Sequence, residues 1–190
     1  MSLDKLLFYT IEPESLKIIW EKFSKKINGK FDFKESIRAN VNGPIYTYEI
    51  VSQLYDCELK ISQTIYIVPG RYDKPTAHEY NLLKNSNKEI LFRIWEKNFF
   101  EKIFRLNNAN TGIPEIDNKF SLNTNQKKLE ELFKKNKKFR ETLTSKDYFF
   151  FIETSKRIVK MTLKRRGIAN SIEDFDNDID ILKLVLNEIN

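Results

Sequence analysis

The chain has 190 residues, of which 41% are hydrophobic and 13% aromatic, and it carries a formal net charge of +6. A chain of this length can bury one sizeable hydrophobic core, and its apolar content is too high for an intrinsically disordered protein. We therefore expect a single domain over residues 1–190, and no apolar run approaches the ~18 residues that a membrane-spanning helix requires.

The positive charge is unevenly distributed along the chain. Residues 171–190 hold six acids and one lysine, a net charge of −5, so the other residues together carry +11. This excess favours an acidic partner, either an acidic protein or nucleic acid, although solvated lysines alone also account for it. The single Cys57 cannot form an intramolecular disulfide, which is typical of a reducing compartment and predicts a cytoplasmic protein. The oligomeric state is not indicated.

The first half of the chain begins with a predicted helix and continues with strands. Apolar residues at three- and four-residue spacing predict a helix over residues 13–27, and Gly29 is its expected stop. Alternating apolar and polar residues predict strands over 45–54 and 59–68. The link between them is short, so we expect an antiparallel hairpin.

Residues 71–89 show no clear strand pattern and are predicted to form a long loop, although 76–83 could form two helical turns. A connection of this length often carries function. The segment contains His78, the only histidine, next to Glu79. A neighbouring carboxylate can tune an imidazole for proton transfer, so the pair is a candidate acid and base. Arg71, His78 and Glu79 define a candidate loop, although a lone exposed histidine is more often inert.

The second half is predicted to contain two hairpins, a short strand and two helices. The first hairpin is expected over 90–95 and 99–106, and a short strand over 119–123. An amphipathic helix over 125–143 follows, and a second hairpin over 148–163 turns at 153–156. Ser171, with Asp174 three positions later, is a capping-box-like start for a final helix that continues to the end of the chain.

Basic residues concentrate on this second half and form the candidate basic surface. Its members are Lys127, Lys128, Lys134, Lys135 and Lys138 on the predicted helix, and Lys160, Lys164 and Arg166 on the last strand. Phosphate groups are the generic partner of such a surface, and Tyr148, Phe149 or Phe151 could provide stacking platforms for bases. No sequence cue of a named nucleic-acid-binding module is present.

No catalytic, cofactor-binding or metal-binding residues are predicted. The five glycines are too far apart for a phosphate-binding loop, and one histidine cannot supply a histidine-based metal cluster. The acids at 174, 176 and 178 resemble the start of a calcium loop, but Ile179 and Val185 stand where that loop needs glycine and glutamate. The Cys57 thiolate is disfavoured by Asp56 and Glu58, which argues against a reactive nucleophile.

One segment carries a resemblance to other proteins. Gly112, Asp117, Phe120 and Leu122 form the pattern Gly-x-x-x-x-Asp-x-x-Phe-x-aliphatic. It resembles a segment of uncharacterised bacterial soluble α+β domains, in which a helix, a hairpin and a C-terminal helix follow. Ile116 stands where those domains commonly have an aromatic residue. The resemblance implies an α+β architecture over residues 45–189 and brings no catalytic residue, and Asp117 is interpreted as a turn residue that caps local backbone.

The patterns together predict an α+β domain with a largely antiparallel sheet of six to eight strands and three long helices packed mainly on one face. The expected function is a non-enzymatic binding or interaction module that uses the basic surface. Two alternatives remain open: a small enzyme or ligand-binding protein that uses the 71–89 loop, and nucleic-acid binding through the lysine and arginine face.

Overall fold

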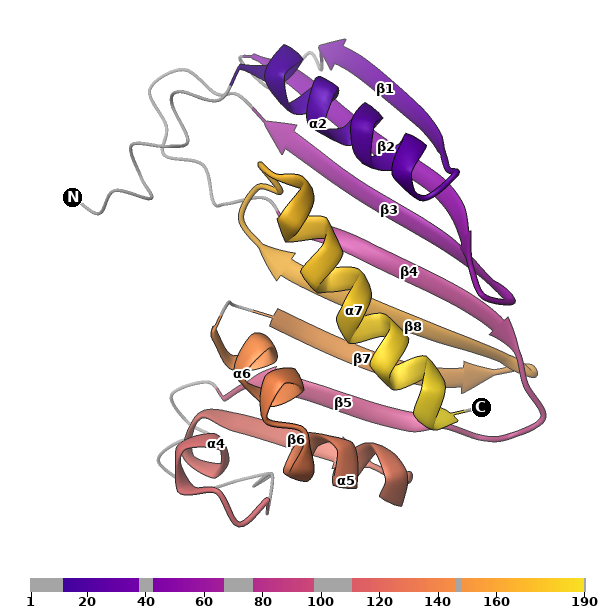
Figure 1. Ribbon diagram of the computed structural model, residues 1–190, viewed down its shortest axis with the longest axis vertical. Coiled ribbons are helices and arrows are strands. Elements are labelled where there is room, and N and C mark those ends of the chain that lie inside the picture. Colours follow the sequence, from indigo (N-terminus) through magenta and orange to yellow (C-terminus); the bar gives the residue numbers. More distant parts are fainter. Residues whose placement is uncertain (1–11, 38–42, 67–76, 98–110, 146–147, 190) are drawn as a thin grey trace.

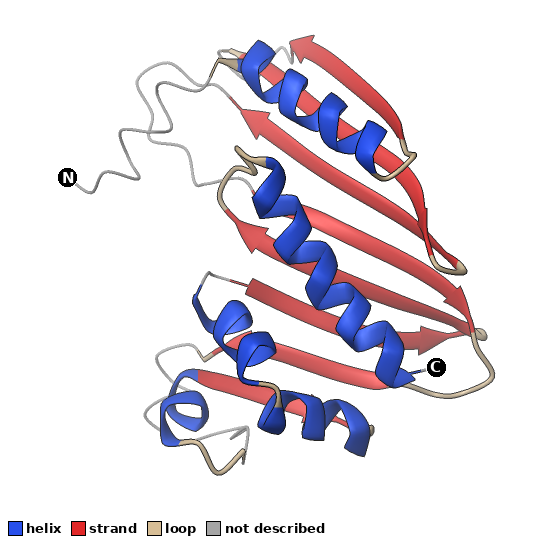
Figure 2. Cartoon of the chain, in the orientation of Figure 1, coloured by secondary structure: helices blue, strands red, loops and turns tan. Residues whose placement is uncertain are grey.

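The structure is a computed structural model that describes residues 12–37, 43–66, 77–97, 111–145 and 148–189. Its main element is an eight-stranded antiparallel sheet that the helices cover on one face (Figure 1). Figure 2 shows the same two layers by secondary structure, strands in one and helices in the other. The predicted α+β class and antiparallel sheet of six to eight strands are confirmed.

The strands do not follow chain order across the sheet. Their spatial order is β1-β2-β3-β4-β8-β7-β5-β6. The bounds are β1 (Lys30–Ile37), β2 (Pro44–Leu54), β3 (Cys57–Tyr66), β4 (Ala77–Asn85), β5 (Leu91–Glu96), β6 (Phe120–Thr124), β7 (Tyr148–Ser155) and β8 (Ile158–Arg166). The β7–β8 hairpin therefore lies between β4 and β5, which are consecutive in the chain. The predicted β2–β3 and β7–β8 hairpins are confirmed, but the second turns at residues 156–157 and not at 153–156, because 153–155 are still paired in β7.

The helices lie on the same side of the sheet. They are α2 (Pro13–Lys26), α4 (Pro114–Lys119), α5 (Lys127–Lys135), α6 (Lys137–Ser145) and α7 (Ile172–Ile189). Helix α2 lies over β1 and β2, α7 crosses the middle strands, and α5 and α6 lie towards β5 and β6 (Figure 1). In the described part of the chain, no helix combines the length and the apolar character that crossing a membrane requires.

The single helix predicted over 125–143 is wrong in one respect, because it is two helices. The break is at Asn136, whose backbone is extended (φ −86°, ψ 98°). Its side-chain Oδ1 accepts a hydrogen bond of 2.9 Å from the backbone N–H of Phe139, so Asn136 both ends α5 and caps the start of α6. The break lets Phe133 and Phe139 meet edge to face, with ring centroids 6.3 Å apart.

The loop predicted over 71–89 is also wrong over residues 77–85, which form the central strand β4. This strand pairs with β3 on one side and β8 on the other. Its inward positions include His78 and Tyr80, so the apolar alternation that marks a strand is missing from the sequence. Arg71 lies outside the described residues, as does the strand predicted over 99–106, while β5 confirms the strand predicted over 90–95.

The two long helices meet through aromatic side chains that form the centre of the core. Phe175 of α7 stacks on Phe23 of α2 with centroids 4.4 Å apart, and it meets Trp20 edge to face at 5.0 Å. All three side chains are fully buried. The predicted helices over 13–27 and from 171 onward are therefore confirmed, and their apolar stripes pack against each other as well as against the sheet.

Helix α2 ends at Lys26, one residue before the predicted end at 27, and the left-handed residue that follows it is Asn28 instead of the expected Gly29. Asn28 adopts the left-handed conformation (φ +52°), and the backbone N–H of Gly29 donates a 2.7 Å hydrogen bond to the carbonyl oxygen of Ser24. Gly29 is needed for another reason, because a Cβ atom there would lie 2.8 Å from Cγ2 of Ile50. The glycine allows the chain to pass close to β2.

The turn between β7 and β8 offers a test of backbone strain. Lys156 and Arg157 both have left-handed backbone, with φ of +48° and +66°, although neither residue favours it. Asparagine followed by glycine suits such a two-residue turn. We expect the double variant Lys156→Asn/Arg157→Gly to raise the free energy of unfolding by about 1 kcal/mol in urea titrations. The control Lys156→Ala/Arg157→Ala removes the same charges but retains the strain, so an equal gain there would contradict this explanation.

Candidate functional site

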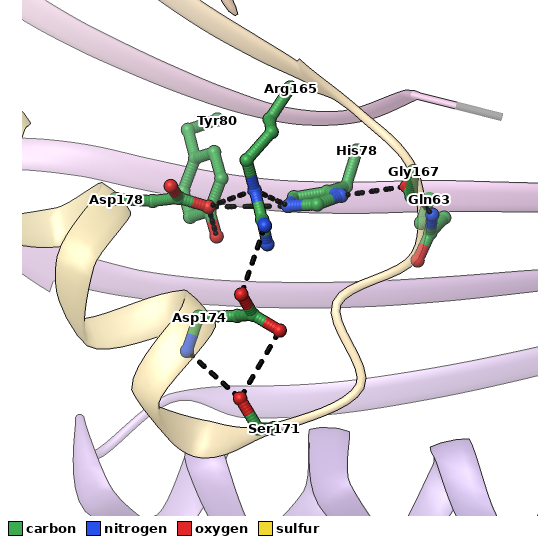
Figure 3. Close-up of polar contacts among 8 residues, drawn as sticks. All are labelled: Gln63, His78, Tyr80, Arg165, Gly167, Ser171, Asp174 and Asp178. Atoms are coloured by element: carbon green, nitrogen blue, oxygen red, sulfur yellow. Dashed lines mark hydrogen bonds and ion pairs between the residues drawn. The ribbon is translucent and has the colours of Figure 1, made fainter. Parts of the chain in front are cut away.

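A cluster of polar side chains is buried between α7 and the sheet. His78 and Tyr80 come from β4, Arg165 comes from β8, and Asp174 and Asp178 come from α7 (Figure 3). Alternation along the strands directs the first three towards the helix layer, and the four-residue spacing of the two acids places them on one face of α7. His78, Tyr80 and Asp178 have no exposed surface, and Arg165 is 4% exposed.

Asp178 is the centre of this cluster. Its Oδ2 accepts hydrogen bonds from the Tyr80 hydroxyl at 2.8 Å and from Arg165 Nε at 3.0 Å. The same oxygen lies 3.2 Å from His78 Nε2. A carboxylate buried without donors would be costly, so the hydrogen bonds from Tyr80 and Arg165 compensate for its removal from water.

The cluster also fixes the connection between β8 and α7. The carbonyl oxygen of Gly167 accepts hydrogen bonds from Gln63 Nε2 at 2.9 Å and from His78 Nδ1 at 3.1 Å. Beyond it, the backbone N–H of Asp174 donates to Ser171 Oγ at 3.2 Å, which confirms the predicted start of the last helix. Polar side chains of β3 and β4 thereby hold the loop that leads into α7.

The partners of His78 assign its tautomer. Nδ1 faces a carbonyl oxygen and must donate, whereas Nε2 lies 2.9 Å from Arg165 Nε, which can only donate. When neutral, the imidazole therefore carries its proton on Nδ1. Because no part of the ring is exposed, His78 acts in this structure as a buried link between strand and helix.

The predicted acid–base pair of His78 and Glu79 is wrong, and so is the placement of His78 in an exposed loop. Consecutive residues of a strand point to opposite faces of the sheet, so the two side chains cannot meet. His78 lies beneath α7. Glu79 lies on the other face, where its carboxylate forms a 2.8 Å ion pair with Lys164 and accepts a 2.9 Å hydrogen bond from Asn81 Nδ2.

The three acids at the start of α7 do not converge on one point, although Asp174 and Asp178 both bind Arg165 through different nitrogen atoms. Asp174 binds Arg165 Nη1 at 3.0 Å, Asp178 lies inside the cluster, and Asp176 pairs with Lys26 of α2. Among the residues that the structure describes, no three His, Cys, Asp or Glu side chains are grouped to hold a metal ion.

The opposite face of the sheet has a different character, because no described helix lies on it (Figure 1). Aromatic side chains lie together there on β5 and β7. Phe149 and Phe151 contact each other edge to face with ring centroids 5.5 Å apart, and Phe149 is 39% exposed. Phe151 lies opposite Arg93 on β5. Trp95 and Phe149 come one residue beyond the last pair of this ladder, Ile94 with Phe150, so the continued register places them next to each other. We call Trp95, Phe149 and Phe151 the aromatic patch.

Basic side chains border the aromatic patch on this face. Lys164 lies opposite Phe149 in the register of β7 and β8. Arg166 occupies the next outward position of β8, and Lys160 lies beyond Thr162 on the other side, opposite Glu153. Arg93 of β5 lies on the patch itself, where it pairs with Glu153 at 2.9 Å. These four basic side chains contribute four positive charges, and Glu79 and Glu153 contribute two negative charges, so this part of the face has a net charge of +2.

The candidate basic surface does not form one face. Lys160, Lys164 and Arg166 lie on the helix-free face, whereas the five candidate lysines of α5 and α6 lie in the helix layer on the other side of the sheet. Three of these helical lysines have acidic neighbours, since Lys134 pairs with Glu130, Lys135 with Glu131, and Lys138 with Asp180. The sheet therefore divides the predicted surface into two separate groups.

A shallow hollow lies on the same helix-free face, at the ends of β3 and β4. It has a volume of about 300 Å³ and is lined by Ser62, Gln63, Thr64, Tyr66, Ala77 and Glu79. Glu79 and Ala77 lie opposite Lys164 and Arg166 in the register of β4 and β8, so the hollow borders the basic residues of β8.

Cys57 provides a prediction about reactivity. Burial raises the pKa of its thiol to about 11, and the Asp56 carboxylate adds to the effect, so the prediction of a disfavoured thiolate is confirmed. At pH 8 only about one thiol in a thousand would be ionised at that pKa. We expect native protein to react with 5,5′-dithiobis(2-nitrobenzoic acid) more than a hundred times slower than protein unfolded in guanidinium. Equal rates in the two samples would contradict the burial of this thiol.

Asp117, in the segment Gly112–Leu122, binds local backbone as expected. Its Oδ1 accepts 2.8 Å hydrogen bonds from the backbone N–H and the hydroxyl of Thr111, and its Oδ2 accepts one of 3.1 Å from the Gly112 N–H. Asp117 therefore stabilises the turn that leads into α4. Comparisons with protein-family models, with curated proteins and with solved structures find no match for this chain.

Several residues of the aromatic patch and of the buried polar cluster could not be grouped from the sequence. Trp95 and Arg93 could not be placed near the phenylalanines, because their proximity depends on β5 pairing with β7 across more than 50 residues of chain. Asp178 and Arg165 were not connected with His78 for the same reason. A usable signal was the outward position of Trp95, which alternates with the core residues Phe92 and Ile94.

Proposed function

We propose that the protein is a non-enzymatic binding module that binds nucleic acid through the helix-free face of its sheet. The observation that supports this most is the aromatic patch of Trp95, Phe149 and Phe151 with basic side chains on both sides of it. Aromatic rings stack on bases of any sequence, and neighbouring cations bind the phosphates.

The chemistry of the face favours a polyanion that also carries flat apolar groups. A purely ionic surface would not need aromatic side chains, yet Phe149 leaves 39% of its surface in solvent. A purely apolar protein interface would be depleted of charge at its centre, yet Arg93 and Lys164 lie beside the aromatic rings. Nucleic acid combines both requirements. The cytoplasmic location expected from the single cysteine is part of this proposal.

Titration of fluorescent single-stranded oligonucleotides at low ionic strength tests the proposal. We expect affinity to fall as salt rises, and the double variant Phe149→Ala/Phe151→Ala to bind roughly 10- to 100-fold more weakly because stacking is lost. Lys160→Ala should reduce the dependence on salt, whereas Lys128→Ala, an exposed lysine in the helix layer, should not. Stacking should also quench the fluorescence of Trp95, while Trp20 is fully buried.

Two results would contradict the proposal. The first is the absence of salt-dependent binding, and the second is binding that the phenylalanine substitutions leave unchanged. If sedimentation instead showed concentration-dependent self-association that Phe149→Ala abolished, the face would be a contact between copies of the chain.

A further inference from the structure

The hollow at the ends of β3 and β4 lies next to the basic residues of β8, on the side away from the aromatic patch. Across the sheet the order is Phe149 on β7, Lys164 on β8, Glu79 on β4 and Ser62 on β3, all opposite one another in register. Neighbouring strands are about 4.8 Å apart, so the hollow begins about 10–14 Å from Phe149. A single-stranded nucleic acid whose bases stack on the aromatic patch therefore reaches the hollow after it has crossed Lys164.

The lining of the hollow suits a planar polar ring. Its volume is about 300 Å³, and Tyr66 at its rim is 40% exposed, so the phenol ring offers a stacking surface. The hydroxyls of Ser62 and Thr64 and the carboxylate of Glu79 add polar groups to the lining. Aromatic and polar groups together on one wall are the usual means of recognising an unstacked base.

Glu79 gives the hollow a chemical preference. Burial alone would raise the pKa of its carboxyl, but hydrogen bonds from Lys164 and Asn81 reverse this and hold the pKa below its usual value. The group is therefore an ionised carboxylate at neutral pH and can only accept hydrogen bonds. A carboxylate has about four lone-pair positions, so it can accept a further hydrogen besides those from Lys164 and Asn81.

We propose that this hollow is a nucleobase subsite that selects a base with an exocyclic amino group, such as cytosine, over one that presents a carbonyl oxygen there. Glu79 accepts the amino hydrogen, Tyr66 stacks on the ring, and Lys164 and Arg166 bind the adjoining phosphates. The inference rests on the proposed function and deepens it, because it adds base preference to a surface whose aromatic patch has none.

Binding of deoxycytidine and deoxythymidine homopolymers of equal length tests the subsite, because the two bases have similar size and differ in the group at position 4. We expect the deoxycytidine polymer to bind roughly tenfold more tightly. Glu79→Gln should remove this preference, since an amide can donate as well as accept. The control Glu58→Gln makes the same change of charge on an exposed residue of the same face outside the hollow and should retain the preference.

The outcomes separate the subsite from the proposed function. Equal binding of both polymers by the unmodified protein, or a preference that persists in Glu79→Gln, would overturn the subsite but leave nucleic-acid binding in place. Failure of every oligonucleotide to bind would overturn both. Tyr66→Ala should lower the affinity for the deoxycytidine polymer roughly tenfold. An unchanged affinity would argue against occupation of the hollow.

Discussion

The variant Asp178→Ala is expected to lose roughly 3–5 kcal/mol of unfolding free energy. The carboxylate has no exposed surface and binds the Tyr80 hydroxyl and Arg165 Nε. Its removal leaves the charged guanidinium of Arg165 inside the core with fewer hydrogen-bond partners, and the Tyr80 hydroxyl loses this acceptor. Urea unfolding followed by far-UV circular dichroism measures the loss.

A neighbour on the same helix provides the control for this variant. Asp180 is exposed, at 52% of its side-chain surface, so Asp180→Ala should change stability by less than about 0.5 kcal/mol. In the Asp178→Ala background, Arg165→Met should cost less than in the unmodified protein, because the unpaired charge is then gone. If Asp178→Ala and Asp180→Ala had equal effects, the cluster would not stabilise the fold.

The second large effect is expected for Phe175→Ala, which should cost roughly 3–5 kcal/mol. The ring is fully buried, stacks on Phe23 and meets Trp20, so it joins α7 to α2. Removal leaves a cavity that two rigid helices cannot close. Guanidinium unfolding should show the loss, and the fluorescence of Trp20 should change even before unfolding, because its neighbour has gone.

Two variants separate the loss of packing from the loss of an aromatic ring. Phe175→Leu should cost less than half as much as Phe175→Ala, since most of the buried volume remains. Phe149→Ala makes the same substitution on the helix-free face, where the ring is 39% exposed, and should cost less than about 1 kcal/mol. A similar cost for Phe149→Ala and Phe175→Ala would be inconsistent with a core on one side of the sheet only.

The elements that the sequence predicts well are those with a local signal. Alternation marks β2, β3 and β8, and apolar spacing marks α2 and α7, so the α+β class follows from short stretches of chain. Strand β4 has no such signal, because His78 and Tyr80 occupy two of its buried positions. Their hydrogen-bond partners are Asp178 for Tyr80, and Arg165 and Gly167 for His78. These partners lie far away in the chain, so no local pattern could reveal them.

The candidate surface was partly predictable for a related reason. Alternation places Lys160, Lys164 and Arg166 on one face of their strand, and the structure agrees. The relation of these residues to Trp95, and to the lysines of α5, depends on the order of the strands. Strand order depends on the whole fold. The sequence could therefore identify the basic residues, but not which other residues lie on the same face of the sheet.

The position of the β7–β8 hairpin between β4 and β5 has a consequence for biosynthesis. During translation, β4 and β5 are made early, but the strands that join them are residues 148–166, near the end of the chain. Until these residues leave the ribosome, the nascent sheet has two unpaired edges that must be kept from aggregating. A chain that stops before residue 148 would therefore yield two incomplete sheets instead of a smaller version of the domain.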